Sequence, residues 1–89
     1  MKLVRFLGSI KKDLKRIKRR KYDTAKLAVI FDLLCTGTSL TPAMRAHMLK
    51  GEWHGFWECH VAPDWLLVYK ITDTEILLAR TGTHADIFG

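Results

Sequence analysis

The chain has 89 residues, of which 48% are hydrophobic and 27% charged, and its formal net charge is +6 at pH 7. A chain this short has room for one small hydrophobic core, so we expect a single domain over residues 1–89. No apolar run approaches the roughly 20 residues that cross a bilayer. The N-terminus also lacks the apolar segment of a secretory signal, which leads us to expect a soluble, cytoplasmic protein.

Cysteine usage agrees with a reducing compartment. Cys35 and Cys59 allow at most one disulfide bond, whereas small secreted domains usually depend on several, so we expect both thiols to be free. Several side chains of zinc-ligating type are present, but no C-x-x-C or H-x-x-x-H pair supplies a recognisable chelating frame. The sequence therefore predicts no metal site and no cofactor.

Positive charge is concentrated near the N-terminus, where eight basic residues fall within positions 11–21. Such a cluster is typical of a solvated helix face, and equally of a surface that binds a polyanion or an acidic protein. Charge alone leaves both interpretations open. Four of these residues, called the basic face below, are the candidates for contacts with RNA: Lys15, Arg16, Lys18 and Arg19.

The N-terminal half of the chain predicts one strand and two helices. Residues 2–7 suit a short strand, and Ser9 is a candidate cap for a first helix with apolar residues at helical spacing. Asp23 or Thr24 is placed to cap a second helix, and Gly37 is placed to end it. The expected apolar stripes of the two helices are Ile10, Leu14 and Ile17, and Leu27, Ile30, Phe31 and Leu34.

The C-terminal half predicts strands. After a connection over residues 38–46, strand-like segments cover residues 53–61, 65–69 and 75–80. We therefore expect an α+β fold of order β-α-α-β-β-β, in which a helical hairpin packs on one face of a small, mainly antiparallel sheet. The other face of the sheet would remain available to a ligand.

Three polar clusters interrupt the strand pattern, one at His47, one from Glu58 to Asp64, and one from Arg80 to His84. Each lies near a strand end, so we expect them to converge on one rim of the sheet. Metal-independent RNA cleavage needs a base for the ribose 2′-OH, a cation for the phosphate and an acid for the leaving oxygen. Histidines and an arginine supply these parts.

Each part also has a purely structural interpretation. A single histidine near a strand end is usually a surface residue, and the three tryptophans are more often packing residues than platforms for bases. Arg80 has candidate salt-bridge partners in Glu75 and Glu58. Residue types alone therefore do not establish an RNA-cleaving site.

Three ordered motifs add a more specific signal: His47–Gly51 (HMLKG), Glu58–Tyr69 (ECHVAPDWLLVY) and Arg80–Phe88 (RTGTHADIF). In these segments the chain resembles the YafQ branch of the RelE/ParE toxin superfamily. The resemblance implies a type II toxin that enters the ribosomal A site, cleaves translated messenger RNA and is silenced by a cognate antitoxin. It also implies an endoribonuclease that is monomeric when free.

The resemblance further implies roles for individual residues. The implied catalytic residues are His47, His60, Asp64 and His84, with Arg80 as the phosphate-stabilising cation and Glu58 as a weaker member. Trp65, Phe88 and Lys50 are implied RNA contacts, with Phe88 stacking on a base. Trp57 stands where relatives often have arginine, and His54 matches no functional position.

Two other functions remain open at this stage. Some members of the superfamily keep the fold without the catalytic set and act by binding DNA gyrase, although the histidines retained here argue against that function. A basic RNA-binding module without turnover would keep the charge and the aromatic residues, but it would need no histidines.

Overall fold

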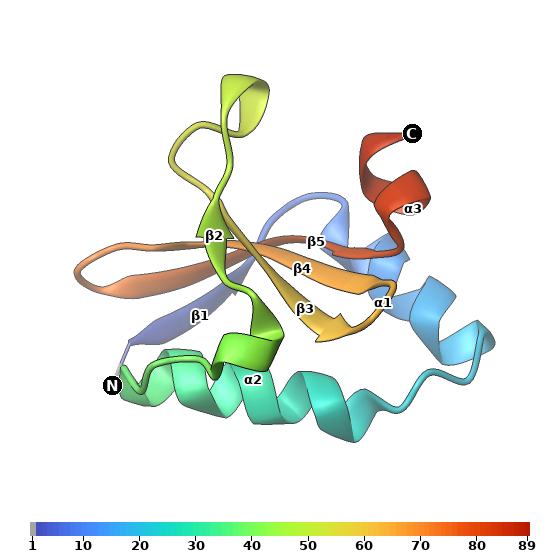
Figure 1. The fold of residues 1–89 in the computed structure, drawn as a ribbon, viewed down its shortest axis with the longest axis horizontal. Coiled ribbons are helices and arrows are strands. Elements are labelled where there is room, and N and C mark those ends of the chain that lie inside the picture. Colours follow the sequence, from blue (N-terminus) through green and yellow to red (C-terminus); the bar gives the residue numbers. More distant parts are fainter. Residues whose placement is uncertain (1) are drawn as a thin grey trace.

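The structure, a computed structural model, describes residues 2–89 as a five-stranded sheet that carries helices on both faces (Figure 1). The elements in chain order are β1 (Leu3–Phe6), α1 (Ile10–Arg19), α2 (Thr24–Thr36), the 3-10 helix η1 (Pro42–Met44), β2 (His47–Met48), the 3-10 helix η2 (Gly51–Trp53), β3 (Trp57–Ala62), β4 (Trp65–Ile71), β5 (Glu75–Gly82) and α3 (His84–Phe88). None of these helices is long and apolar enough to cross a membrane.

The strands lie in the order β1-β5-β4-β3-β2. β1 pairs with β5 in parallel, and the other neighbours pair antiparallel. The α+β class and the mainly antiparallel sheet are therefore confirmed. Two elements were not expected from the sequence: the two-residue strand β2, which contains His47, and the C-terminal helix α3, which begins at His84.

Local signals explain where the long helices begin and end. The Asp23 carboxylate accepts a hydrogen bond from the Ala25 amide at 3.1 Å, which caps α2. Gly37 ends the same helix in the left-handed conformation with φ 73°, which glycine adopts without steric cost. Ser9 occupies the expected cap position of α1, but its hydroxyl makes no capping hydrogen bond.

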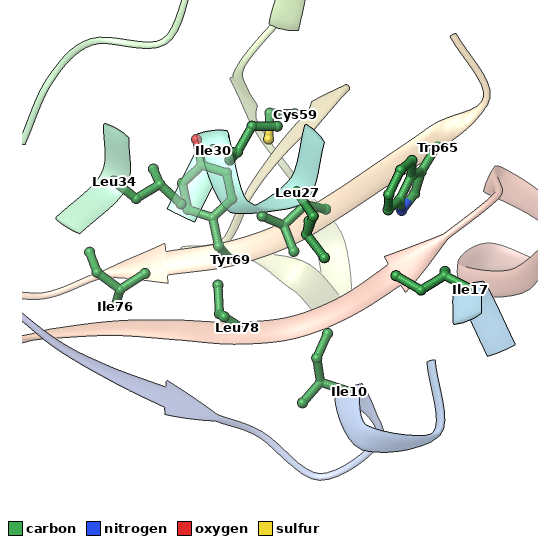
Figure 2. Close-up of a cluster of buried hydrophobic side chains, with 11 residues drawn as sticks. Ile10, Ile17, Leu27, Ile30, Leu34, Cys59, Trp65, Tyr69, Ile76 and Leu78 are labelled. Carbon is green, nitrogen blue, oxygen red and sulfur yellow. The ribbon is translucent and has the colours of Figure 1, made fainter. Parts of the chain in front are cut away.

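The main core lies between the sheet and the two long helices. Alternate residues of β4, including Leu67 and Tyr69, point toward α1 and α2 together with Leu78 of β5. Figure 2 shows the apolar residues of both helices converging on this layer. The expected helix stripes are confirmed as core, although Leu14 and Phe31 are only partly buried.

A second, smaller cluster lies on the opposite side of the sheet. Leu66 and Val68 of β4 form its floor, and Ile87 of α3 is buried against it. The segment that contains η2 also packs there, and in Figure 1 this segment and α3 rise from the side of the sheet opposite α2. Below, this side of the sheet is called the open face, because no long helix covers it.

Candidate functional site

Strand register places three of the expected site residues in one line across the open face. His47 of β2 lies opposite Glu58 of β3, Glu58 lies opposite Val68 of β4, and Val68 lies opposite Arg80 of β5. Directly opposed residues share a face of the sheet. Because adjacent strands are about 4.8 Å apart, Glu58 and Arg80 stand roughly 10 Å apart on the backbone, on either side of an apolar valine.

A second line runs beside the first. His60 of β3 lies opposite Leu66 of β4, which lies opposite Gly82 of β5. His60 is two residues from Glu58, so the alternation along a strand places both on the open face. The expected convergence at a rim is therefore corrected. His47, Glu58, His60 and Arg80 are brought together across a face, because their strands are neighbours in register.

The His47 ring is held between two acceptors. Its Nδ1 atom lies 2.9 Å from the Arg45 carbonyl oxygen, and its Nε2 atom lies 3.5 Å from Glu58 Oε1. The Glu58 side chain is only 9% exposed, whereas that of His47 is 52% exposed. The carboxylate is thus buried while the ring faces solvent. The Arg45 carbonyl holds Nδ1 by a hydrogen bond, and Nε2 forms an ion pair with Glu58 when the ring is protonated.

α3 places two more expected residues at the edge of the open face. Thr83 caps this helix by accepting a hydrogen bond from the Asp86 amide, and the Asp86 carboxylate accepts one from the Thr83 amide. The His84 ring packs on the Phe88 ring one turn later, with centroids 5.0 Å apart. Trp53 of η2 meets Phe88 edge-on at 6.5 Å. An exposed imidazole and a half-buried aromatic ring therefore share one small surface.

Arg80 is not free, because a buried carboxylate on α1 holds its guanidinium. Its Nε and Nη2 atoms donate to Asp13 at 2.7 and 3.2 Å, and Asp13 is 1% exposed. Arg16 also donates to Asp13, at 3.0 Å. Hydrogen bonding to Asp13 raises the pKa of Arg80 above its ordinary value. The alternative partners expected from the sequence are corrected, since Glu75 pairs with Arg5 and Glu58 faces His47.

Asp13 is a site residue that the sequence analysis missed. β1 pairs with β5 only as far as Leu78, and beyond that point the Thr81 amide donates to Asp13 at 3.1 Å. The signal was available, because Asp13 lies three residues after Ile10 and four before Ile17, on the buried stripe of the helix. An acidic residue on the buried side of a basic helix indicates a buried partner.

Trp65 does not lie where an RNA contact would. It is 3% exposed and points into the main core, where its indole N–H donates to Thr81 Oγ1 at 2.8 Å and its ring meets Tyr22 at 4.9 Å. A ring that is 3% exposed offers no free face to a base, so Trp65 has a structural role in this fold, and its implied RNA contact stays a prediction. Asp64 is exposed in the turn between β3 and β4, beside a hollow of about 260 Å³ that Tyr22 and Lys26 also line.

The basic residues lie where charge patterning predicted. Lys15, Lys18 and Arg19 are exposed on α1, and with Arg16 and Lys12 they border a hollow of about 510 Å³. Arg16 is half-buried because of its bond to Asp13. Lys50 is exposed just before η2.

Both cysteines are free thiols, as expected. Burial raises the pKa of the Cys59 thiol to about 12, which leaves it protonated and unreactive at neutral pH. Within residues 2–89, no three His, Cys, Asp or Glu side chains gather closely enough to hold a metal ion. The expectation of metal independence stays a prediction.

Taken together, the fold and the open face define a small α+β protein that carries the parts of an acid–base nuclease: histidines, a carboxylate and an anchored arginine on one surface. The family model described as "Bacterial toxin of type II toxin-antitoxin system, YafQ" matches residues 3–89. The chain belongs to this YafQ family of bacterial toxins.

Individual relatives agree with this assignment. The chain is 41% identical over 87 residues to the mRNA interferase toxin YafQ of Escherichia coli strain K12, covering 97% of this chain and 95% of that protein. It superposes on YafQ in the crystal structure of the E. coli DinJ–YafQ complex with a TM-score of 0.92, at 37% identity and full coverage of both chains. It also superposes on a metal-bound toxin from Helicobacter pylori with a TM-score of 0.91, at 34% identity, covering 99% and 100% of the two chains.

Proposed function

We propose that this type II toxin is an endoribonuclease that cuts messenger RNA through the ribose 2′-OH. The observation that carries the proposal is the line of His47, Glu58 and Arg80 across the open face, with His60 in the next line and His84 at its edge. This surface offers imidazoles as acid and base and a cation for the phosphate, and His47, His84 and Arg80 each contact a neighbour in the fold. The E. coli K12 relative reported above is named an mRNA interferase toxin, which supports the same activity.

The reaction is an intramolecular phosphoryl transfer, in which the phosphorus passes from the 5′-oxygen of one nucleotide to the 2′-oxygen of its neighbour. A base removes the 2′-OH proton, the 2′-oxygen attacks the adjacent phosphorus, and the bond from phosphorus to the 5′-oxygen breaks. An acid donates a proton to that leaving oxygen, so the products are a 2′,3′-cyclic phosphate and a free 5′-OH. His47 and His84 are our candidates for the proton transfers, with His60 and Asp64 assisting. Arg80 is the candidate cation for the phosphate, and Phe88 for stacking on a base.

His47 is better placed to act as a cation or an acid than as a base. Its Nδ1 atom is hydrogen-bonded to the Arg45 carbonyl at 2.9 Å, and its Nε2 atom faces the Glu58 carboxylate at 3.5 Å, an arrangement that favours positive charge on the ring. Within residues 2–89, no oxygen acceptor holds the His84 ring, which packs on Phe88. We therefore assign the proton-accepting step to His84 and the charged role to His47.

The test compares histidine variants on a short RNA. Replacing His84 or His47 by Ala should lower kcat by about a hundredfold or more, because a positioned acid or base contributes roughly 10² to 10⁴ in rate. His54, an exposed residue that follows η2, is the matched control, and His54→Ala should change little. Near-parental turnover of both site variants would overturn the assignment.

The substrate provides a second test. A deoxyribose on the 5′ side of the scissile phosphate should abolish cutting, because the nucleophile is then missing. Saturating EDTA should leave cleavage of the short RNA intact if the reaction needs no metal. Mapping of new 5′ ends after incubation with translating ribosomes tests the ribosomal A site as the place of action, and it also separates an RNase from a gyrase-binding toxin or a non-catalytic RNA-binding module.

The remaining parts of the proposal concern partners. A cognate antitoxin should neutralise this chain in the cytoplasm, as the DinJ–YafQ complex of E. coli suggests by its composition. The free toxin should be a monomer. Purification from cells that also express the neighbouring genes should yield a complex, and recovery of only free, active toxin would contradict this part.

A further inference from the structure

α3 needs outside support to hold its residues in place. It has five residues, and an isolated helix shorter than about 12 residues is marginal in water. Its first residue is His84 and its last is Phe88, so any tilt of the helix moves both. The capping box and the burial of Ile87 against Leu66 and Val68 anchor the helix to the sheet. Neither contact ties the helix to α1.

A bidentate ion pair supplies this missing support. Arg20, which follows α1, donates from Nη1 and Nη2 to the two carboxylate oxygens of Asp86 at 2.6 and 3.1 Å. The backbone carbonyl of Asp86 accepts a third bond, from Arg80 Nη2 at 3.1 Å. Paired N–H···O bonds of this kind fix orientation as well as distance. Asp86 is thereby tied to α1 and to β5.

The Arg20–Asp86 pair stays ionised across the pH range in which proteins are usually studied. Hydrogen bonding by Arg20, with further bonds from Thr83, holds the pKa of the Asp86 carboxyl well below its usual range. The contribution of the ion pair to the free energy of unfolding is therefore fully present above about pH 4, where an unfolded Asp is ionised. It is lost only in stronger acid, as the folded carboxyl becomes protonated. The contact is intact across the range in which histidine titrates.

We propose that the Arg20–Asp86 ion pair positions α3, and through it His84 and Phe88, for the cleavage reaction. Arg20 and Asp86 are both positioning residues, and the inference rests on the proposed role of His84. Arg20 lies outside the open face, so it acts through Asp86 rather than by touching RNA. Misplacement of a reacting group by about 1 Å can cost roughly a hundredfold in rate.

The kinetic test replaces Arg20, so that every residue of α3 and of its capping box is retained. Arg20→Gln should lower kcat on a short RNA by about tenfold to a hundredfold, with a much smaller change in KM. Arg20→Lys keeps the charge but loses the two-pronged contact, so it should recover only part of the rate. Arg5→Gln is the matched control. Arg5 is also an exposed arginine, it lies on β1, and its Nη1 atom is 3.2 Å from the Glu75 carboxylate.

A double-mutant comparison separates positioning from other effects. Because His84 is the reacting group on α3 and Phe88 only stacks on a base, most of the loss should run through His84, so Arg20→Gln should slow the His84→Ala protein by less than about threefold. A full additional loss in the double variant would overturn the proposal. So would an Arg20→Gln protein that keeps the parental kcat and shows only a raised KM, because that result would place Arg20 in RNA binding.

NMR provides a readout that does not depend on activity. Arg20→Gln should shift or broaden the His84 imidazole signals and raise the titration midpoint of the Asp86 carboxyl toward about 3.9, whereas Arg5→Gln should do neither. If His84→Ala keeps its activity while these shifts occur, the proposed function fails and the ion pair still orders α3. Unchanged His84 and Asp86 signals would refute the positioning role.

Discussion

Asp13 shows how a single buried carboxylate can organise a surface of opposite charge. It accepts hydrogen bonds from Arg16, from two nitrogens of Arg80 and from the Thr81 amide. A charge removed from water in this way is tolerated only when it is paired and hydrogen-bonded, and all of these conditions are met here. The result is an arginine whose direction on the open face is set from α1.

Removing the Asp13 carboxylate should be costly. Asp13→Ala leaves Arg80 without its main partner and the Thr81 amide without an acceptor, so the free energy of unfolding should fall by about 3 to 5 kcal/mol. Urea denaturation monitored by circular dichroism measures this change. Asp73, exposed in the turn between β4 and β5, is the matched control, and Asp73→Ala should stay within about 0.5 kcal/mol of the parental value. Equal stability of the two variants would show that the buried carboxylate is not structural.

At the scale of elements, the passage from β5 to α3 is tightly constrained. Gly82 is buried with φ 149°, and a Cβ atom at this position would lie 2.9 Å from Asp86 Oδ2 and 3.0 Å from Asp86 Cβ. The strand can turn into the helix only if residue 82 lacks a side chain. The close approach of Asp86 to Gly82 places its carboxylate beside the Thr83 amide, from which it accepts a hydrogen bond at 2.9 Å.

Gly82→Ala should therefore displace α3. We expect the free energy of unfolding to fall by about 1 to 3 kcal/mol, from backbone strain and overpacking, and cleavage to fall more steeply because His84 moves with the helix. Thermal unfolding and single-turnover cleavage measure the two effects. Gly8→Ala is the control, since a Cβ there would meet nothing within 4 Å. A Gly82→Ala protein with parental activity would contradict the account of α3 given above.

At the scale of the whole molecule, the basic face and the candidate site lie on different parts of the surface. The basic face is on α1, which packs against the sheet on the side opposite the open face. Hydrogen bonds join the two surfaces: Arg80 donates both to Asp13 of α1 and to the Asp86 carbonyl of α3, and Arg20 donates to the Asp86 carboxylate. Under the proposed function, we expect a long polyanion such as ribosomal RNA to engage α1 while a messenger strand occupies the open face.

Replacing Lys15, Arg16, Lys18 and Arg19 together by Gln should weaken binding to ribosomes and flatten its salt dependence. Each lost phosphate contact removes about 0.7 from the slope of log K against log salt for single-stranded nucleic acid. Arg16 should contribute least, because Asp13 already engages it. Binding measured at several salt concentrations tests this, with Arg5→Gln as the control that removes one charge from the edge strand. An unchanged slope would contradict the binding role of the basic face.

The sequence by itself determined the elements with strong periodicity and clear punctuation. Ile30 and Leu34 at helical spacing, Asp23 as a cap and Gly37 as a stop define α2, because these signals are local and do not depend on distant residues. The strand-like segments of the C-terminal half, the positively charged helix and the family motifs with their histidines could also be predicted from the sequence.

Only the tertiary structure decided which residues meet. His47 faces Glu58 because β2 and β3 are in register, and Arg80 is held by a carboxylate 67 positions away. Trp65 is buried because it lies on the same face of β4 as Leu67 and Tyr69, the face that packs against the helices. Such contacts depend on strand order, register and the point at which β1 stops covering β5, and these are set by packing across the whole molecule rather than by any local pattern.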